Sequence, residues 1–298
     1  MSKSTSNKPI LTEANFDNVD YFLRYPDVAQ HPAYQGVPNG GWLHWVQYGK
    51  SEGRQACALD KVVNPTATTP SLAHRQQGYH LLNGQGLEIG ALHQPAQLPK
   101  TCTVEYCDVA PREVLITYFP ELKVTDLVEI HHVCDLDKEA LSIFPANHYD
   151  FIIINHVIEH VANPIRVIEE LFRVIKPGGC VVISAPDKDF TFDKRRNLTP
   201  FAHLLEEYRQ NVTEVTDEHY LDFLQAVHPE RAGTSPDILA IHLQQIRDRR
   251  EHAHVWDSQS FEAFMQASLA LLRIEATCIF SHKANEGNYF EYFSVWRK

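Results

Sequence analysis

Apolar runs alternate with amphipathic stretches along the chain from residue 71 onward. Short apolar runs predict strands over 86–90, 103–108, 127–133, 149–155 and 180–186, and helical spacing predicts helices over 71–82 and 164–176. Asn163, before the second helix, is a typical cap, and Pro177 ends that helix. Strands that alternate with helices form a parallel sheet, and such sheets bind ligands at the carboxyl ends of their strands.

The last hundred residues break this alternation. Residues 199–250 are polar and helix-like with no strand between them, which predicts a helical cap over the strand ends. A further helix over 258–271 precedes two β-branched or aromatic runs, 273–280 and 289–296, which predict an antiparallel hairpin. The sequence therefore predicts an α/β fold with a mostly parallel, Rossmann-like sheet, a terminal antiparallel hairpin and a helical cap.

The first part of the chain has a composition of its own. Residues 1–62 are rich in aromatic residues and predict a small helical module, in which Pro26 interrupts one helix and a second begins near Trp42. A stretch rich in Pro and Thr, 63–70, predicts a linker. The expected organisation is this module, the linker, and one larger domain over 71–298 with the cap at about 199–250.

Composition narrows the class of protein. The chain has 298 residues, with 27 Lys and Arg against 38 Asp and Glu and a formal net charge of −11, which argues against nucleic acid or an anionic membrane as partner. No apolar run approaches the roughly 20 residues of a membrane span, and no secretory signal is visible. The six cysteines show no CxxC spacing and are expected to be reduced. We therefore expect a cytoplasmic protein.

Polar residues follow three of the predicted strands. Glu88 and Gly90 end the first, Asp108 ends the second, and Asn155 and His156 follow the fourth. A glycine at the first turn permits close approach of the backbone to a ligand, and an acidic residue about twenty residues later can accept both hydroxyls of a ribose. Together these features favour an adenosine-containing cofactor. A nicotinamide dehydrogenase is disfavoured because G-x-G-x-x-G is missing after the first strand.

The larger domain resembles the class I S-adenosylmethionine-dependent methyltransferases, in particular the type 11-like branch. The matching motifs are Glu88-Ile-Gly90, His156-Val-Ile-Glu-His160, Asn163-Pro164, 171–179 and Pro186-Asp-Lys188. The resemblance covers roughly residues 80–298 and implies S-adenosylmethionine as cofactor. It also implies a set of cofactor contacts that runs from the methionine end through the ribose to the adenine and the pocket wall: Glu88, Gly90 and the neighbouring Ala91, then Asp108, then Asp137 and Lys138, and finally Asn155 and His156.

Further groups stand where members of this family bind their acceptor. The expected acceptor-binding residues are Asp187, Lys188, Phe192, Asp193, Arg195 and Trp256. Strand-like alternation puts His252 and His254 on one side of an extended segment, so these two and His156 are candidate catalytic bases, although solvated loop histidines are an equally open interpretation. His160 is expected to pack. No metal is expected, because no third ligand has diagnostic spacing, and most of the 17 histidines are expected not to be catalytic.

The resemblance implies an S-adenosylmethionine-dependent methyltransferase that acts on a small polar metabolite. A hydroxyl of a sugar-like acceptor is the first expectation, and a sulfur or nitrogen of an amino-acid-like acceptor is the second. The glycines that the family carries after Gly90 are missing here, so a catalytically inactive binding or scaffold protein is the alternative. A homodimer is also open.

The N-terminal module has a resemblance of its own. It is similar to a short module found beside glycan-processing and surface-polysaccharide enzymes, at Phe16, Asp17, Tyr21, Tyr25-Pro-Asp-Val-Ala29, His44-Trp45, Tyr48-Gly49 and Glu52-Gly-Arg54. This resemblance implies a link to carbohydrate biosynthesis, and a packing or dimerising role is equally open.

Overall fold

The computed structural model describes residues 16, 18–35, 37, 39–52, 54, 56, 72–118 and 122–298 of the chain. The chain divides into two compact units, Met1–Pro70 and Ser71–Lys298. The predicted linker, 63–70, lies outside the described residues. None of the described helices combines the length and the apolar character that a membrane crossing needs.

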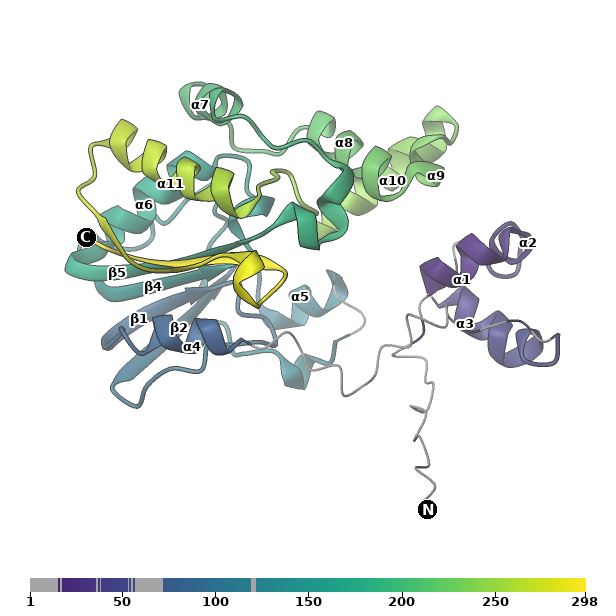
Figure 1. Ribbon diagram of the computed structural model, residues 1–298, viewed down its shortest axis with the longest axis horizontal. Helices are drawn as coiled ribbons and strands as arrows, with labels where there is room; N and C mark the ends of the chain where they lie inside the picture. Colours follow the sequence, from purple (N-terminus) through teal and green to yellow (C-terminus); the bar gives the residue numbers. More distant parts are fainter. Residues whose placement is uncertain are drawn as a thin grey trace, which may run out of the picture. The chain divides into compact units, whose positions relative to one another are not determined.

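The larger unit is built on a seven-stranded sheet with the strand order β3-β2-β1-β4-β5-β7-β6 (Figure 1). The strands are β1 (Gly84–Ile89), β2 (Cys102–Asp108), β3 (His132–Val133), β4 (Tyr149–Asn155), β5 (Ile175–Pro186), β6 (Thr277–His282) and β7 (Glu291–Arg297). Neighbouring strands from β3 to β5 are parallel, whereas β7 is antiparallel to both β5 and β6. The predicted mostly parallel sheet with its terminal antiparallel pair is confirmed. The strand order reverses at β1 and β4, so the carboxyl ends of these strands form the topological switch point.

Helices cover both faces of the sheet (Figure 1). The helices of the sheet layer are α4 (Ala73–Tyr79), α5 (Arg112–Tyr118), α6 (Pro164–Val174) and α11 (Ser258–Leu272), with short 3-10 turns at Val124–Asp126, Ile158–His160, Lys188–Phe190, Phe192–Arg195 and Ala284–Glu286. α6 and α11 pack on one face, against side chains such as Leu87 and Ile152. α4 packs on the other face, where Tyr79 contacts Phe293. Because β4 is covered on both sides, its central residues are fully buried, as an apolar run predicts.

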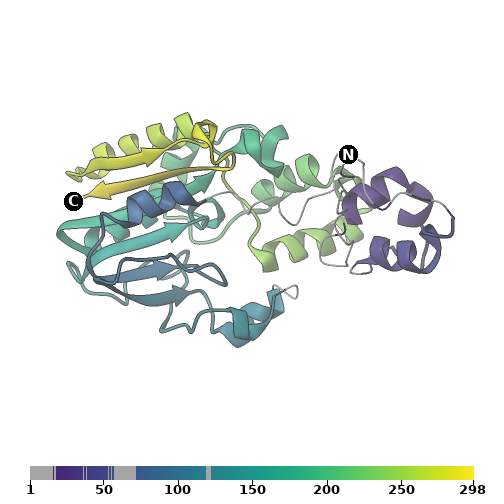
Figure 2. The same cartoon turned by 60° about the horizontal axis from the view of Figure 1, so that its bottom comes forward.

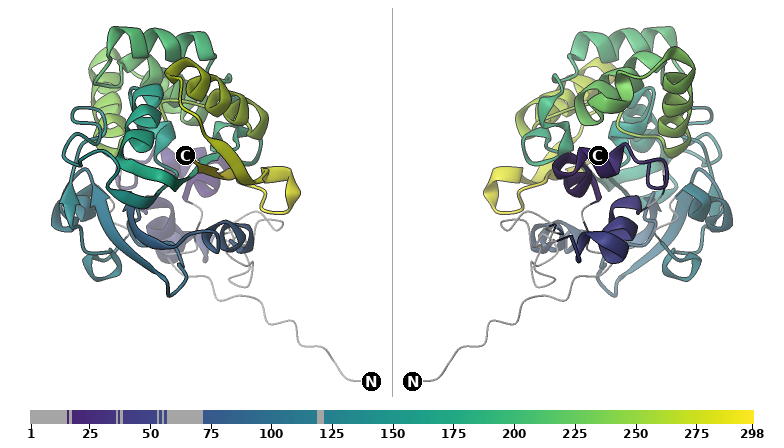
Figure 3. Two further views of the ribbon diagram at one scale, coloured as in Figure 1. Left: turned by 90° about the vertical axis from the view of Figure 1, so that its left-hand side faces the viewer. Right: turned by 90° about the vertical axis from the view of Figure 1, so that its right-hand side faces the viewer.

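The segment predicted as a helical cap is largely helical. It contains α7 (Phe201–Gln210), α8 (Asp217–Val227), α9 (Pro229–Ala232) and α10 (Pro236–Arg249). The helices α8 to α10 extend beyond the carboxyl ends of the parallel strands (Figure 2), and the segment lies on the side of the sheet that carries α6 and α11 (Figure 3). Phe223, Leu224 and Ile246 form the centre of a small core between these helices.

The connection from β1 to β2, residues 90–101, contains no helix. Pro95 and Pro99 interrupt it, and a proline disfavours a helical conformation at the residue before it. Ala96 and Leu98 instead pack on the face of the sheet that carries α4. The segment after Gly90, where the family's further glycines are missing, is therefore a loop that packs on the sheet.

Contacts across the fold change the predicted bounds of the third strand and of the helix after β4. The third strand is limited to His132–Val133, because the ring Nδ1 of His131 accepts the backbone N–H of Tyr106 at 3.0 Å in place of a strand carbonyl. The helix α6 ends at Val174 because Ile175 already pairs with Tyr149 in the sheet. Tertiary pairing thus decided both boundaries.

The smaller unit consists of short helices. They are α1 (Asn18–Arg24), α2 (Pro26–Ala29), α3 (Gly40–His44) and a π-helical turn over Trp45–Gly49. The hydroxyl of Tyr21 lies 3.0 Å from Nδ1 of His44, and Arg54 forms two hydrogen bonds to Asp27, at 3.0 and 2.7 Å. The conspicuous residues of the N-terminal motif therefore bond to one another and account for the internal packing of this unit.

Candidate functional site

A cavity of about 450 Å³ lies at the carboxyl ends of β1, β2 and β4. The strand ends contribute Gly90, Asp108 and His156, and the end of α10 contributes residues 247–251. The apolar part of its lining comes from Ile89, Leu92, Val109, Leu115, Leu136 and Val161. The cavity therefore occupies the topological switch point, where sheets of this kind bind ligands.

Gly90 lets the chain turn sharply out of β1. Its φ is +71°, and a Cβ built on it would lie 2.5 Å from Cγ2 of Val157. Its N–H donates to the carbonyl of Cys107 at 3.0 Å. Ala91 is buried behind this turn and does not belong to the described residues that line the cavity. Glycine is required here both for the left-handed backbone and for the close contact.

We expect Gly90→Ala to destabilise the fold more than Gly178→Ala. Both glycines have a left-handed φ, +71° and +80°, but no atom lies within 4 Å of a Cβ built on Gly178. The backbone cost of about 1–2 kcal/mol is common to both variants, and the clash with Val157 is added only at Gly90. Thermal unfolding of both variants measures the difference, and equal midpoints would show that Val157 moves aside without cost.

Asp108 presents an unpaired carboxylate oxygen at the cavity. Its Oδ1 accepts the N–H of Val109 at 2.7 Å, whereas its Oδ2 is buried and has no hydrogen-bond partner among the described residues. Burial raises the pKa of Asp108 to about 6. A buried acceptor without a donor is costly for the protein alone. A ligand hydroxyl would supply the missing donor.

Glu88 is a second buried carboxylate near the end of β1. Both of its oxygens accept the backbone N–H of Ala96, at 3.0 and 3.1 Å, which holds the loop after β1 in place. Burial raises its pKa to about 7. Its neighbours Leu87 and Ile89 pack on the face of α6 and α11, so Glu88 points to the opposite face. It stands behind the cavity rather than in its described lining.

β4 ends in a polar network. The amide of Asn155 donates to the hydroxyl of Tyr79 at 3.0 Å, and its Oδ1 accepts the hydroxyl of Ser184 at 3.0 Å. The next residue, His156, has a left-handed φ of +53°, and its N–H donates to the carbonyl of Ser184 at 3.1 Å. This turn directs the imidazole to the cavity, where its Nε2 lies 2.8 Å from Oε2 of Glu291.

Glu291, the first residue of β7, is the centre of this network. Its side chain is fully buried. Its carboxylate accepts hydrogen bonds from Nε and Nη2 of Arg75, at 2.7 and 2.6 Å, and lies 2.6 Å from Nε2 of His74. Although burial favours the protonated form, the hydrogen bonds from His156, His74 and Arg75 hold the pKa of Glu291 well below its usual range. An ionised carboxylate only accepts, so Nε2 of His156 carries a proton, and in the neutral ring Nδ1 is the acceptor nitrogen.

The residues assigned to the adenine lie beside the cavity. Asp137 accepts a backbone N–H at 2.7 Å, and together with Asp135 it pairs with Arg250. Lys138 is exposed and lies 3.9 Å from Asp135. Leu136, next to Asp137 in the sequence, and Arg250, its ion-pair partner, both belong to the cavity lining. Asp137 therefore fastens the end of α10, and the structure directs Lys138 to solvent.

Three of the predicted acceptor-binding residues have structural contacts. Asp187 accepts the N–H and the hydroxyl of Ser258, at 2.8 and 2.7 Å, at the start of α11. Trp256 is 2% exposed and packs against Phe261 in the core. The ammonium of Lys188 donates to a backbone carbonyl at 3.2 Å. Trp256 belongs to the core of the domain, and its role in acceptor binding stays a prediction.

The remaining predicted acceptor-binding residues lie on the turn Phe192–Arg195. Phe192 is half exposed, and its ring centroid lies 4.7 Å from that of His252. Asp193 is buried and lies 2.6 Å from Nδ1 of His252 and 2.9 Å from Arg196. Arg195 is exposed. The main consequence of this turn is the orientation of His252.

The structure separates the two histidines predicted to act as a pair. The Nε2 of His252 faces Glu159, whereas the ring of His254 lies against His219. His254 is 1% exposed, and burial holds its pKa well below the usual range, so its ring is neutral. Neither residue belongs to the described lining of the cavity. Of the predicted bases, only His156 borders the cavity.

Several residues at or near the cavity were not predicted from the sequence. His160 lines the cavity although it was expected only to pack, and Glu159 is buried between His160 and His252. Both belong to the motif 156–160 after β4, and this motif was the sequence signal that could have identified them. No signal marked Glu291 or Arg250, since both come from distant parts of the chain.

Comparison with known proteins shows where this fold belongs. Residues 83–268 match a family model described as a methyltransferase domain. A search of curated protein sequences found no significant match.

Solved structures similar to this chain include three methyltransferases. One is an S-adenosylmethionine-dependent methyltransferase from Aquifex aeolicus (14% identity over 79% of this chain and 95% of that chain, TM-score 0.39). Another is a possible histamine N-methyltransferase from Thermotoga maritima (14% identity, 76% and 87%, TM-score 0.40). The chain spans about half, 48%, of the length of the CurJ carbon methyltransferase, which matches 72% of this chain (13% identity, TM-score 0.37).

The family match extends over more than half of the chain. Its range includes the end of β1 with Gly90, the unpaired oxygen of Asp108 and the turn at His156. A buried acceptor beside an apolar cavity suits the ribose of an adenosine-containing ligand. The chain therefore belongs to the methyltransferase domain family and is an S-adenosylmethionine-dependent methyltransferase.

Proposed function

We propose that the protein transfers a methyl group to a hydroxyl of a small polar acceptor, with a sugar-like molecule as the first candidate. The observation that carries this proposal is His156, which borders the cavity with its Nε2 bonded to Glu291 and its Nδ1 as the acceptor nitrogen. A hydroxyl must lose a proton during methyl transfer, whereas a thioether sulfur need not. A neutral imidazole is suited to take that proton near pH 7.

The residues of the cavity suit S-adenosylmethionine. The unpaired Oδ2 of Asp108 is an acceptor for ribose hydroxyls, and the backbone at Gly90 permits close approach. Leu115 and Leu136 offer apolar contacts for an adenine. Bound S-adenosylmethionine would supply an electrophilic methyl group for the acceptor oxygen, with its thioether as the leaving group.

The residues of this chain would supply the proton acceptor and the alignment. His156 takes the acceptor proton at Nδ1, and the buried carboxylate of Glu291 stabilises the imidazolium that results. Arg75 and His74 hold Glu291 in position. Residues 247–251 cover the cavity and help to exclude water. Alignment of this kind can account for roughly 7–11 kcal/mol of a reaction barrier.

A sugar-like acceptor is favoured within the class of hydroxyl compounds. The N-terminal unit resembles modules that accompany glycan-processing enzymes, at the positions Tyr21, His44 and Arg54 among others. The net charge of −11 disfavours a polyanionic acceptor. The resemblance favours a polyol, and the net charge disfavours only an acidic one.

Transfer of labelled methyl groups tests this proposal. The full chain is incubated with methyl-labelled S-adenosylmethionine and with three separate acceptor pools: sugars and other polyols, amines, and thioethers. We expect an O-methyl product from the polyol pool, identified by mass spectrometry and NMR. Label confined to the amine or thioether pool would replace the hydroxyl proposal. Binding of S-adenosylhomocysteine without transfer to any pool would favour the inactive alternative.

We expect His156→Ala to lower kcat by about 10²- to 10⁴-fold, because that is the typical contribution of a positioned proton acceptor. The affinity for S-adenosylhomocysteine, measured by calorimetry, is expected to change much less, and added imidazole is expected to restore part of kcat. The control is His80→Ala, an exposed histidine at the end of α4. A loss of affinity as large as the loss of kcat would make His156 a cofactor contact rather than a base.

A further inference from the structure

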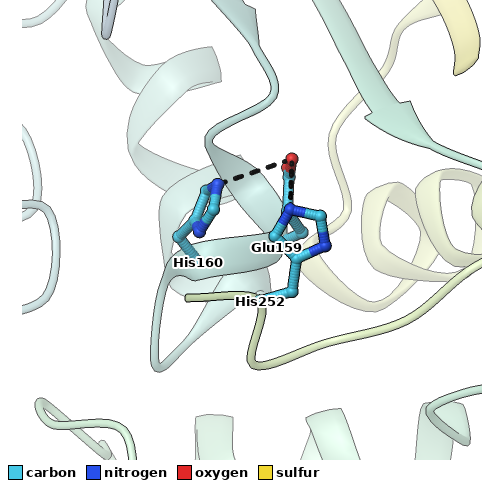
Figure 4. A group of neighbouring side chains, drawn as sticks. All are labelled: Glu159, His160 and His252. Carbon is cyan, nitrogen blue, oxygen red and sulfur yellow. Dashed lines mark ion pairs between the residues drawn. The ribbon is translucent and has the colours of Figure 1, made fainter. Parts of the chain in front are cut away.

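Three side chains with metal-ligating atoms lie close together (Figure 4), and one of them, His160, also lines the cavity. Glu159 and His160 belong to the 3-10 turn Ile158–His160 after β4, and His252 follows α10. Oε1 of Glu159 lies 3.6 Å from Nε2 of His160 and 3.9 Å from Nε2 of His252. The potential ligand atoms of these three residues all lie within 4.8 Å of one another. We call these three residues the Glu159 cluster.

Glu159 is a buried carboxylate whose oxygens accept no hydrogen bond from the described residues. Its exposed fraction is 1%, and neither carboxylate oxygen has a hydrogen-bond partner in the described part of the chain. Distances of 3.6 and 3.9 Å to the rings are longer than a hydrogen bond. The carbonyl of Glu159 also accepts the N–H groups of Ala253 and His254, at 2.8 and 3.0 Å, which holds the segment of His252 against the turn. A buried carboxylate held in this way needs a cationic partner.

The hydrogen bonds of the two rings leave their Nε2 atoms as acceptors. Nδ1 of His160 lies 2.5 Å from the carbonyl oxygen of Arg250, and Nδ1 of His252 lies 2.6 Å from the carboxylate of Asp193. Both partners accept, so both Nδ1 atoms carry a proton, and in the neutral form of each ring Nε2 has a lone pair that faces Glu159. A histidine that donates its other N–H to a carbonyl or a carboxylate is the usual form of a metal ligand.

The spacing of these atoms resembles the spacing around a metal ion. Zinc binds histidine nitrogen and carboxylate oxygen at about 2.0–2.2 Å, so two ligand atoms of a tetrahedral site lie roughly 3.4 Å apart. The observed distances of 3.6 and 3.9 Å are only slightly longer. A third ring, that of His156, has its Nδ1 3.7 Å from the same oxygen of Glu159. A mixed set of nitrogen and oxygen donors suits divalent transition metals better than Ca²⁺ or Mg²⁺.

We propose that Glu159, His160 and His252 bind a divalent transition-metal cation at the edge of the cofactor cavity. Three protein ligands leave a coordination position open, and both His156 and His160 border the cavity. A hydroxyl that takes the open position loses its proton more easily, and Nδ1 of His156 accepts that proton. The role of the cation in catalysis rests on the proposed hydroxyl acceptor, whereas the binding of the cation does not.

A similar group in the cap provides a matched control. Glu207 lies 3.1 Å from Nε2 of His203 and 2.8 Å from Nε2 of His219, both within hydrogen-bond distance. His203 is exposed, whereas Glu159 and His252 are buried. One carboxylate oxygen of Glu207 is therefore within hydrogen-bond distance of two ring nitrogens, whereas neither carboxylate oxygen of Glu159 is.

Metal binding by the chelator-treated full chain tests the site. Calorimetric titration with Mn²⁺ and with Zn²⁺, without cofactor or acceptor, is expected to show one site per chain, and each metal is expected to raise the unfolding midpoint. Glu159→Gln keeps the shape of the side chain and removes an unpaired buried charge, so we expect it to fold. It and His252→Gln are expected to weaken binding by at least about 10-fold. Glu207→Gln is expected to bind like the unaltered chain.

The outcomes separate the site from the proposed function. No binding at millimolar Mn²⁺ or Zn²⁺, or binding that is lost in Glu207→Gln but kept in Glu159→Gln, overturns the cation site. If the metal binds as expected but no polyol is methylated, the cation site is supported and the proposal of a hydroxyl acceptor is contradicted. If a chelator leaves the methylation of polyols unchanged, the proposed catalytic role of the cation is contradicted, and the proposal of a hydroxyl acceptor stands.

Discussion

Asp108→Asn is expected to weaken the binding of S-adenosylhomocysteine by about 10- to 100-fold, because hydrogen bonds to a charged group contribute about 1.5–3 kcal/mol each. The reason is the buried Oδ2 of Asp108, which has no partner within the described structure and faces a cavity suited to a ribose. The same substitution is expected to raise the free energy of unfolding without ligand by about 1 kcal/mol, since a neutral amide costs less to bury than a carboxylate. Calorimetry and chemical denaturation measure the two effects.

The pH dependence of the same residue gives a second measurement. Burial raises the pKa of Asp108 to about 6, from an ordinary value of 3.8. The ionised form is the better acceptor, so ligand affinity is expected to fall as the pH drops through about 6, and Asp108→Asn is expected to remove this dependence. Because the folded pKa is raised, the carboxyl destabilises the ligand-free fold above about pH 6 and not below about pH 4. Exposed Asp126, changed to Asn, is the control. Equal affinity in both variants would exclude Asp108 from the cofactor site.

Glu291→Ala is expected to lower the free energy of unfolding by about 3–5 kcal/mol, the usual cost of removing one partner of a buried ion pair. Arg75, which is buried, loses its bidentate partner, and His74 and His156 lose their acceptor. We also expect kcat to fall, since the tautomer of His156 is no longer held. Chemical denaturation and initial rates measure these effects.

Two further variants test whether the loss of stability comes from a buried charge that has lost its partner. Arg75→Met combined with Glu291→Leu removes both charges and is expected to recover part of the stability, although not the activity. Lys176→Met breaks a half-exposed ion pair with Asp150 and is expected to leave the unfolding midpoint almost unchanged. The pKa of Glu291 is held well below its usual range, so its contribution is present above the unfolded-state pKa and is lost as the pH falls through the folded-state value. A Glu291→Ala variant as stable as Lys176→Met would contradict the buried network.

The elements that the sequence predicted well are those decided by neighbours along the chain. The buried strands, the interruption of the N-terminal helices at Pro26 and the cap of α6 are examples, and Oδ1 of Asn163 accepts the N–H of Arg166 at 3.1 Å as a capping residue should. Periodicity and capping need only contacts within a few residues. Boundaries such as the start of β5 at Ile175 differ because they depend on pairing with another strand.

The candidate site divides in the same way. Its strand-end positions, Gly90, Asp108 and His156, could be predicted because parallel strands carry their ligand sites at their carboxyl ends. The partners of these residues could not, because Glu291 and the segment that holds Arg250 and His252 reach the site only through the closing of the sheet and the packing of the cap.

The sequence by itself determined the fold class, the methyltransferase family and the carboxyl edge of the sheet as the place of the candidate site, since each of these depends on local pattern. Only the tertiary structure decided which histidines lie at the cavity. It buried His254 away from the cavity, and it aimed His160 and His252 at the unpaired carboxylate of Glu159. Desolvation, tautomer and metal-like spacing depend on distances between atoms that are remote in the chain, and no periodicity along the sequence encodes those distances.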